Sequence, residues 1–161
     1  DSSPSRGLGD VYKRQHNASL IHDDLQDRDL LRRGLPTIWN RFGDHTAINL
    51  GDYFIAGSFE ALSKIKGNPE NKCKAIEHLS YTIQQTVKGQ SLEILERGNL
   101  NLRMEEYEST AKAKTGGLIC WPIKLIMILN GEKNIDEFNF NPLYEAGLAY
   151  QIQYDLSLIN I

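Results

Sequence analysis

Apolar side chains along this chain recur at intervals of three and four positions, which is the spacing of residues that share one face of an α-helix. No sustained alternation of apolar and polar positions is present, and no Asn-Gly or Asp-Gly pair joins two strand-like runs. The pattern therefore predicts an all-α protein. The expected helices cover about 16–33, 44–66, 70–97, 105–115, 117–130 and 142–155.

Glycine, proline and asparagine mark the expected ends of these helices, because these residues interrupt or cap helical backbone. Asn141-Pro142 opens the last helix, since proline is tolerated in the first turn. Internal repeats, low-complexity tracts and interdomain linkers are missing from the sequence, which indicates one domain. The other breaks are expected at 34–36, 67–69, 98–99, 116–117 and 130–131.

The composition is that of a soluble globular protein, with 161 residues, 40% hydrophobic and 24% charged. A net charge of −3 gives no basic face for nucleic acid. The longest apolar run, Leu118 to Leu129, contains Lys124 and is shorter than the roughly 20 residues of a membrane span. Cys73 and Cys120 lack metal-ligand spacing and are typical of buried thiols in a reducing compartment. We therefore expect a cytoplasmic location.

The two ends of the chain look foreign to the rest. Ser5 to Gln15 resembles a translated sequencing adapter, and Leu156 to Ile161 resembles the reverse complement of the same adapter with one base changed. The alternative is a native Ser/Gly-rich arm and an apolar tail. On the adapter interpretation, residues 1–15 and 156–161 are non-native tails, residues 16–155 are a segment of a longer protein, and residues 1–15 should be disordered or pack weakly.

Three acidic residues lie together in the first expected helix, at Asp23, Asp24 and Asp27. Asp23 and Asp27 are four positions apart, so their carboxylates lie one helical turn apart on the same face and repel each other unless a cation lies between them. Mg²⁺ commonly binds one or two protein carboxylates and completes its octahedron with water and phosphate oxygens. A solvated acidic helix face is the alternative explanation for these residues alone.

Two arginines follow the acidic residues, at Arg32 and Arg33, before Gly34. One guanidinium group can donate hydrogen bonds to two phosphate oxygens at once. Carboxylates that could bind a metal, followed by arginines, are therefore typical of a diphosphate-binding site. Favourable charge at a helix C-terminus capped by Gly34 also explains the arginines, and it is compatible with the first interpretation.

This sequence resembles the polyprenyl synthetase family of trans-isoprenyl diphosphate synthases over essentially all of 16–155. Ser19 to Asp27 with Arg32-Arg33-Gly34 is similar to the family's first aspartate-rich motif and its trailing arginines. Three further motifs follow in the family's order, and they are Gly89-Gln90-Ser-Leu-Glu93, Lys114-Thr115-Gly116 and Tyr150-Gln151-Ile152.

The resemblance implies a partial isoprenoid-synthase helical bundle around a central cavity. It also implies an Mg²⁺-dependent prenyltransferase that condenses isopentenyl diphosphate with an allylic prenyl diphosphate, as a homodimer in the full-length protein. By similarity, Asp23 and Asp27 would hold Mg²⁺, with Asp24 in support. Arg32 would bind the allylic diphosphate, and Arg33 would bind the diphosphate of isopentenyl diphosphate.

The resemblance also assigns residues of the later helices. Lys114 would reach the allylic diphosphate, while Thr115 and Gln151 would line the position where the allylic carbocation forms. Gln90 would belong to the polar wall near the metals. Glu93 would belong to the same wall, although the family usually has Asp at this position.

The second aspartate-rich motif of the family is altered here, since Tyr154 stands at its first aspartate and Asp155 is followed by the adapter-like tail. We therefore expect the 161-residue chain itself to be inactive. A catalytically dead regulatory subunit and a class I terpene cyclase are the alternatives. The dipeptide His22-Asp23 also occurs in metal-dependent phosphohydrolases, but further His and Asp ligands with suitable spacing are missing.

The resemblance further places the floor of the product cavity four and five positions before Asp23, at Ser19 and Ala18. A bulky aromatic residue there stops chain growth early in the family, and both residues are small here. We therefore expect a product of C20 or longer, with geranylgeranyl diphosphate as the single most favoured product. Ala18→Phe should shorten it, unless Ala18 is a helix-packing residue.

Overall fold

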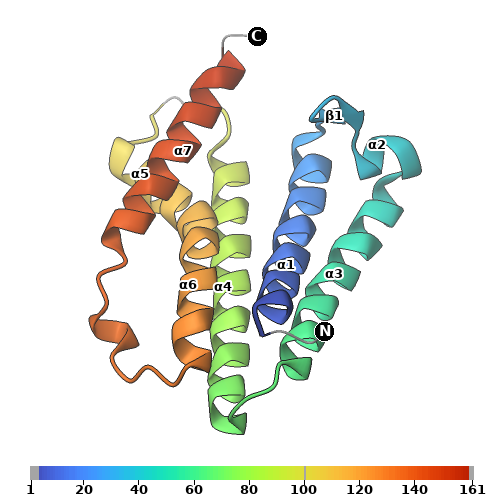
Figure 1. Cartoon of the computed structure of the whole chain (residues 1–161). Coiled ribbons are helices and arrows are strands. Elements are labelled where there is room, and N and C mark those ends of the chain that lie inside the picture. The colour runs from blue at the N-terminus through green and yellow to red at the C-terminus, as the bar shows by residue number, and fades with distance from the viewer. Residues whose placement is uncertain (1–3, 100, 160–161) are drawn as a thin grey trace. The chain divides into compact units, whose positions relative to one another are not determined.

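Helices make up most of the chain in its computed structural model (Figure 1), which confirms the prediction of an all-α protein. Two compact units, Asp1–Gly67 and Asn68–Ile161, are described here one at a time. The structure describes residues 4–99 and 101–159, with side chains for 7–99, 101–135, 137–153 and 156.

The first unit is built on two long helices joined by a short hairpin and a single helical turn. α1 and α3 lie side by side (Figure 1). The two-residue strands β1 and β2 form an antiparallel pair. The elements are α1 (Pro4–Asp27), β1 (Leu31–Arg32), β2 (Leu35–Pro36), α2 (Ile38–Phe42) and α3 (Asp44–Lys64).

Glycines allow close packing between α1 and α3. A methyl group added at Gly57 would lie 2.8 Å from an Arg14 guanidinium nitrogen, and one at Gly51 would collide with the His22 ring. A methyl group added at Gly7 would lie 3.2 Å from the Ile65 side chain. Residues of α1 therefore contact residues of α3 in reverse order, as expected for antiparallel helices.

The N-terminal residues pack more tightly than the sequence predicts. We expected residues 1–15 to be disordered or weakly packed, but α1 begins at Pro4 and Val11 is fully buried. The physical reason is register, because Gly7, Val11 and Arg14 fall on the face of α1 that also carries His22. The expectation of weak packing is therefore wrong for the described part of this segment. The adapter origin of residues 1–15 and 156–161 stays a prediction.

The second unit begins with the longest helix, α4 (Pro69–Glu96). The Asn68 side chain accepts a hydrogen bond from the Glu70 amide at 2.8 Å, and Pro69 occupies the first turn, which is a standard N-terminal cap. The elements that follow are α5 (Met104–Ala111), the π-helical turn η1 (Lys112–Gly116), α6 (Gly117–Leu129), the 3₁₀ turn η2 (Ile135–Glu137) and α7 (Asn141–Ile159).

The predicted break at 116–117 does not exist. Gly116 and Gly117 both have right-handed helical dihedral angles, so α5, η1 and α6 follow one another without a turn. Gly116 instead gives room for Tyr144 of α7, since a methyl group added at Gly116 would collide with the Tyr144 ring. Packing between helices, and not a helix end, explains this glycine.

The core of the second unit lies between α4 and α6, which run side by side (Figure 1). Leu79 of α4 and Trp121 and Leu125 of α6 are buried there. Cys120 is buried as expected, whereas Cys73 is exposed, so the expectation of a buried thiol is wrong for Cys73. Across the described residues, no helix combines the length and apolar character that a membrane crossing requires.

Candidate functional site

The acidic residues of the first unit lie on the last two turns of α1. Asp23 and Asp27 are both half-buried and share one face of the helix. Asp24 points elsewhere and is only 4% exposed. Its Oδ1 accepts a hydrogen bond from Arg32 Nε at 2.6 Å. Burial raises the pKa of Asp24, and the Arg32 guanidinium opposes that rise. The structure therefore separates an Asp23/Asp27 pair from an Asp24–Arg32 ion pair.

The sequence predicted a first helix that reaches residue 33, but α1 ends at Asp27. This earlier end allows Arg32 to contact Asp24. Arg28 adopts φ 59°, a left-handed conformation in which the helix cannot continue. Arg33 and Gly34 then make a two-residue turn with φ 53° and 79°, the geometry that tight hairpins need. This hairpin directs Arg32 back toward α1.

Side chains from the next segment fix the start of the hairpin. Thr37 Oγ1 donates to the carbonyl of Asp29 at 2.6 Å, and Trp39 Nε1 donates to the same carbonyl at 2.8 Å. Asn40 Nδ2 donates to the Leu30 carbonyl at 3.0 Å. These bonds occupy carbonyl groups that a regular helix would otherwise use, so they stabilise the change of chain direction.

Arg28 has its own partners. Its guanidinium forms two hydrogen bonds to the Asp44 carboxylate at 2.9 and 2.8 Å and lies 5.0 Å from the centre of the Trp39 ring. A non-glycine residue in the left-handed region costs about 1–2 kcal/mol. The paired charge and the ring contact offset that cost and connect the end of α1 to the start of α3.

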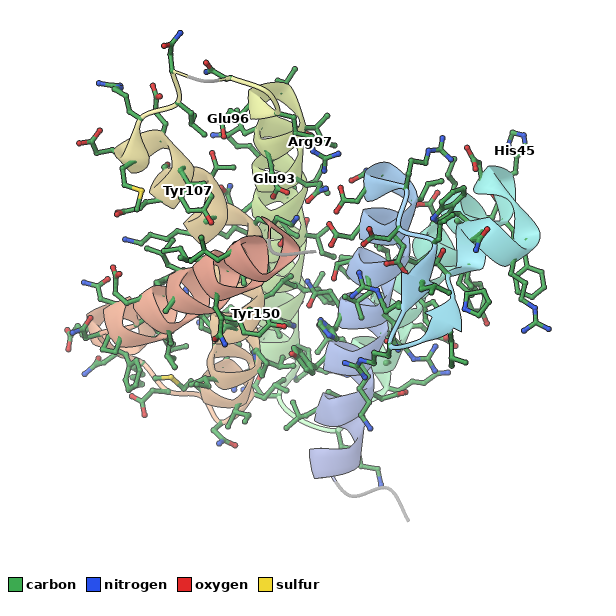
Figure 2. The ribbon with its side chains drawn as sticks, turned by 90° about the horizontal axis from the view of Figure 1, so that it is seen from above. His45, Glu93, Glu96, Arg97, Tyr107 and Tyr150 are labelled. Atoms are coloured by element: carbon green, nitrogen blue, oxygen red, sulfur yellow. The ribbon has the colours of Figure 1, made fainter. Side chains whose placement is uncertain are left out.

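The polar residues of the second unit lie where α4 faces η1. Lys114 Nζ forms an ion pair with Glu93 Oε2 at 2.9 Å. Thr110 Oγ1 donates to Glu96 Oε1 at 3.3 Å. Figure 2 shows Glu93 and Glu96 on the C-terminal half of α4. Two carboxylates on one face of α4 are therefore paired, one with a lysine and the other with a hydroxyl group, on the facing helical segment.

Thr115 and Gln151 meet across η1 and α7. Thr115 Oγ1 donates to Gln151 Oε1 at 3.1 Å, which fixes the direction of the amide group. The π-helical turn carries both Lys114 and Thr115, and such turns occur often at functional sites. The structure thus places Thr115 against Gln151, with Lys114 next to Thr115 in the same π-helical turn. The roles of these three residues toward a substrate stay a prediction.

Gln90 is buried, with 9% of its surface exposed. Neither its Oε1 nor its Nε2 has a hydrogen-bond partner among the described residues. Buried amide groups are nearly always hydrogen-bonded, so an unpaired one next to Gly89 and close in sequence to Glu93 is a candidate ligand-binding group.

Comparisons with known proteins agree with the family resemblance of the sequence. The sequence model of the family described as Polyprenyl synthetase matches residues 3–157. The geranylgeranyl pyrophosphate synthase of Geoglobus acetivorans is 32% identical over 94% of this chain and 51% of its own length. The geranylgeranyl diphosphate synthase of Saccharolobus solfataricus is 35% identical over 88% of this chain and 43% of its own length.

The chain belongs to the polyprenyl synthetase family. The solved geranylgeranyl pyrophosphate synthetase of Geoglobus acetivorans matches the fold of this polyprenyl synthetase chain with a TM-score of 0.85 and 29% identity. That match covers 97% of this chain and 55% of the solved one. The helices are therefore those of the isoprenoid synthase fold, and the chain spans about half the length of the curated relatives it matches.

His16 is a further candidate functional residue of this polyprenyl synthetase, and the sequence motifs did not identify it. Burial lowers its pKa, and the nearby charges of Arg32 and Arg33 lower it further. The Tyr12 ring stacks on the imidazole at 5.6 Å between centres. The signal was helical spacing, because His16 lies seven residues before Asp23 and therefore shares its face of α1.

The two residues expected to set product length lie differently from each other. Ala18 is 1% exposed and lies midway between Arg14 and His22, the residues that contact Gly57 and Gly51 of α3. Ala18 therefore lies on the face of α1 that packs against α3. Ser19 is half-buried, and its Oγ donates to the His16 carbonyl at 2.8 Å.

The side chains of Tyr154 and Asp155, at the altered second motif, lie outside those that the structure describes. Within the described part of the chain, no three His, Cys, Asp or Glu side chains gather in a group that could hold a metal ion.

Proposed function

We propose that the full-length protein is a prenyl diphosphate synthase, which condenses isopentenyl diphosphate with an allylic prenyl diphosphate. The observation that carries the proposal is the end of α1, where the Asp23/Asp27 pair adjoins a hairpin that holds Arg32 by its 2.6 Å contact with Asp24. Paired carboxylates beside fixed guanidinium groups suit a ligand that is both metal-bound and highly anionic.

Mg²⁺ fits the donor set of the first unit. Asp23 and Asp27 offer hard oxygen ligands one turn apart, which matches the one or two carboxylates that Mg²⁺ takes from proteins. Asp24 already accepts a hydrogen bond from Arg32, so its proposed role is to support Arg32. Bound Mg²⁺ would neutralise charge on the diphosphate leaving group.

Residues of the chain are proposed to bind the two diphosphates. Arg32 and Lys114 would contact the allylic diphosphate, and Arg33 would contact the diphosphate of isopentenyl diphosphate. The buried, unpaired Gln90 amide would satisfy its hydrogen bonds with polar groups of the bound ligands. Positive groups held in place before reaction stabilise the negative charge that develops as the leaving group departs.

The proposed reaction breaks the C–O bond of the allylic substrate, and the electron pair leaves with the diphosphate. The alkene of isopentenyl diphosphate then forms a new C–C bond to the allylic cation, and loss of one proton restores a double bond. Thr115 and Gln151, joined at 3.1 Å, would present polar atoms near the cation. Exclusion of water would protect the cation from capture.

The product is proposed to be C20 or longer, since two relatives are geranylgeranyl diphosphate synthases by name and Ser19, four positions before Asp23, is small. We further propose a homodimeric, cytoplasmic full-length enzyme. The 161-residue chain is proposed to be inactive by itself.

The proposal is tested by incubating the full-length protein with labelled isopentenyl diphosphate, farnesyl diphosphate and Mg²⁺, followed by chromatography of the dephosphorylated products. We expect label in a C20 or longer alcohol and none after metal chelation. Release of hydrocarbons from farnesyl diphosphate alone would instead indicate a terpene cyclase. Incorporation that requires a second, different subunit would indicate a regulatory subunit.

A further inference from the structure

Two residues of α4, one helical turn apart, both contact Lys114. Gly89 faces the backbone of the π-helical turn. A methyl group added at Gly89 would lie 2.5 Å from the backbone nitrogen of Lys114 and 2.9 Å from its Cα. Real Cβ atoms do not approach backbone atoms this closely, so any larger residue would have to move the turn. Glycine therefore allows the backbone of Lys114 to lie directly against α4.

Glu93 contacts the other end of the same residue. Its Oε2 lies 2.9 Å from Lys114 Nζ, and the Lys114 side chain is only 13% exposed. A lysine ammonium group that is largely removed from water needs a hydrogen-bonding partner of opposite charge. Glu93 supplies one, which also defines the direction of the four-carbon side chain.

We propose that Gly89 and Glu93 are positioning residues for Lys114, with Gly89 setting the place of its backbone and Glu93 the direction of its ammonium group. The inference rests on the proposed function only in that Lys114 is taken to bind a diphosphate. Glu93 would then hold the ammonium group in the absence of substrate and share it with the diphosphate on binding.

The position of a lysine can be measured without substrate, by the rate at which an acylating reagent modifies it. The ion pair with Glu93 and the low exposure of the Lys114 side chain both limit access of the reagent to Nζ. A buried and paired Lys114 should therefore react slowly in the 161-residue chain. Peptide mass spectrometry gives its rate relative to the exposed Lys66 and Lys88, which serve as internal references.

Glu93→Gln should raise the relative acylation rate of Lys114 by about fivefold, the scale of losing one partly exposed ion pair. Glu93→Asp, which keeps the charge, should restore part of the protection. Gly89→Ala should raise the rate as well, because the displaced turn takes Nζ away from Glu93. The matched controls are Glu77→Gln, at an exposed position of α4, and Gly9→Ala, where an added methyl group meets nothing within 4 Å.

The proposal is overturned if Glu93→Gln leaves the Lys114 rate at the wild-type value while the circular dichroism spectrum is unchanged. If Gly89→Ala does not fold, Glu93→Gln and Glu93→Asp still decide the outcome. A general rise at Lys66 and Lys88 together with Lys114 would show loosening of the whole fold and would also count against the proposal.

Inorganic pyrophosphate with Mg²⁺ separates this inference from the proposed function. Slower acylation of Lys114 on adding pyrophosphate supports diphosphate binding. If pyrophosphate does not slow the acylation of Lys114 in the wild-type full-length protein, the role given to Lys114 in the proposed function is contradicted. The test of Gly89 and Glu93 as positioning residues depends only on the acylation rates without ligand.

Discussion

Replacing Ala18 by leucine tests whether this position packs helices or limits product length. Ala18 is 1% exposed and lies between the Arg14–Gly57 and His22–Gly51 contacts of the α1–α3 interface. Three added carbon atoms have no free space in an interface that relies on glycine. We therefore expect Ala18→Leu to destabilise the first unit.

The magnitude follows from overpacking. Extra methylene groups in a well-packed core typically cost about 1–3 kcal/mol, and a loss of 1 kcal/mol lowers the melting temperature of a small domain by about 4–8 °C. The melting temperature of Ala18→Leu should therefore fall by roughly 5–20 °C. Thermal unfolding followed by circular dichroism at 222 nm measures the change in the 161-residue chain.

Ala56→Leu provides the matched control, because Ala56 is an exposed residue of α3 and such a substitution changes stability by about 0.5 kcal/mol or less. The reasoning is refuted if Ala18→Leu has the same melting temperature as the wild type while the same substitution in the full-length protein shortens the product. That result would place Ala18 at the wall of the product cavity, as the resemblance alone implies.

Three further results are expected. Thr37→Val removes the 2.6 Å hydrogen bond to the Asp29 carbonyl and should lower the unfolding free energy by about 1–2 kcal/mol in a urea titration. The lowered pKa of His16 means that the folded state binds its proton less readily than the unfolded state, so stability should fall as the pH drops below about 6.5, and His16→Asn should remove that component. Asp23→Asn or Asp27→Asn should lower turnover by the full-length enzyme at least ~100-fold at saturating Mg²⁺.

Each of these experiments has a control in the chain. Thr46→Val removes an exposed hydroxyl group that donates to the Phe42 carbonyl four residues earlier, at the α2–α3 junction. A loss as large as that of Thr37→Val would therefore argue against a special role for the hairpin. For His16, the unfolding free energies of the wild type and His16→Asn are compared above and below pH 6.5, and the same pH dependence in both proteins would contradict the assignment. Asp52→Asn, at an exposed carboxylate of α3, should keep full turnover, and equal loss there would contradict the metal assignment.

Local sequence determined the long helices. The expected ranges 44–66 and 70–97 differ by no more than two residues at either end from α3 (Asp44–Lys64) and α4 (Pro69–Glu96). Periodic apolar positions and the Asn68-Pro69 cap act within a few residues, so a single sequence contains them. The same holds for the one-turn spacing of Asp23 and Asp27, which helix geometry alone fixes.

Contacts between distant residues decided the rest. α1 ends at Asp27 because Arg28 adopts a left-handed conformation that Asp44, sixteen residues away, stabilises. The hairpin that returns Arg32 to Asp24 depends on Thr37 in the same way. Local propensity disfavours these conformations, so only the tertiary structure could supply them.

The sequence predicted the motif residues of the candidate site, and the tertiary structure decided their partners. Lys114, Thr115 and Gln151 were recognisable from their motifs, but the ion pair of Lys114 with Glu93 and the 3.1 Å bond between Thr115 and Gln151 join different helices. Gly116 was expected to break a helix and instead allows one to pack closely. Glycine has the same local signature in both situations, and only the neighbouring helix distinguishes them.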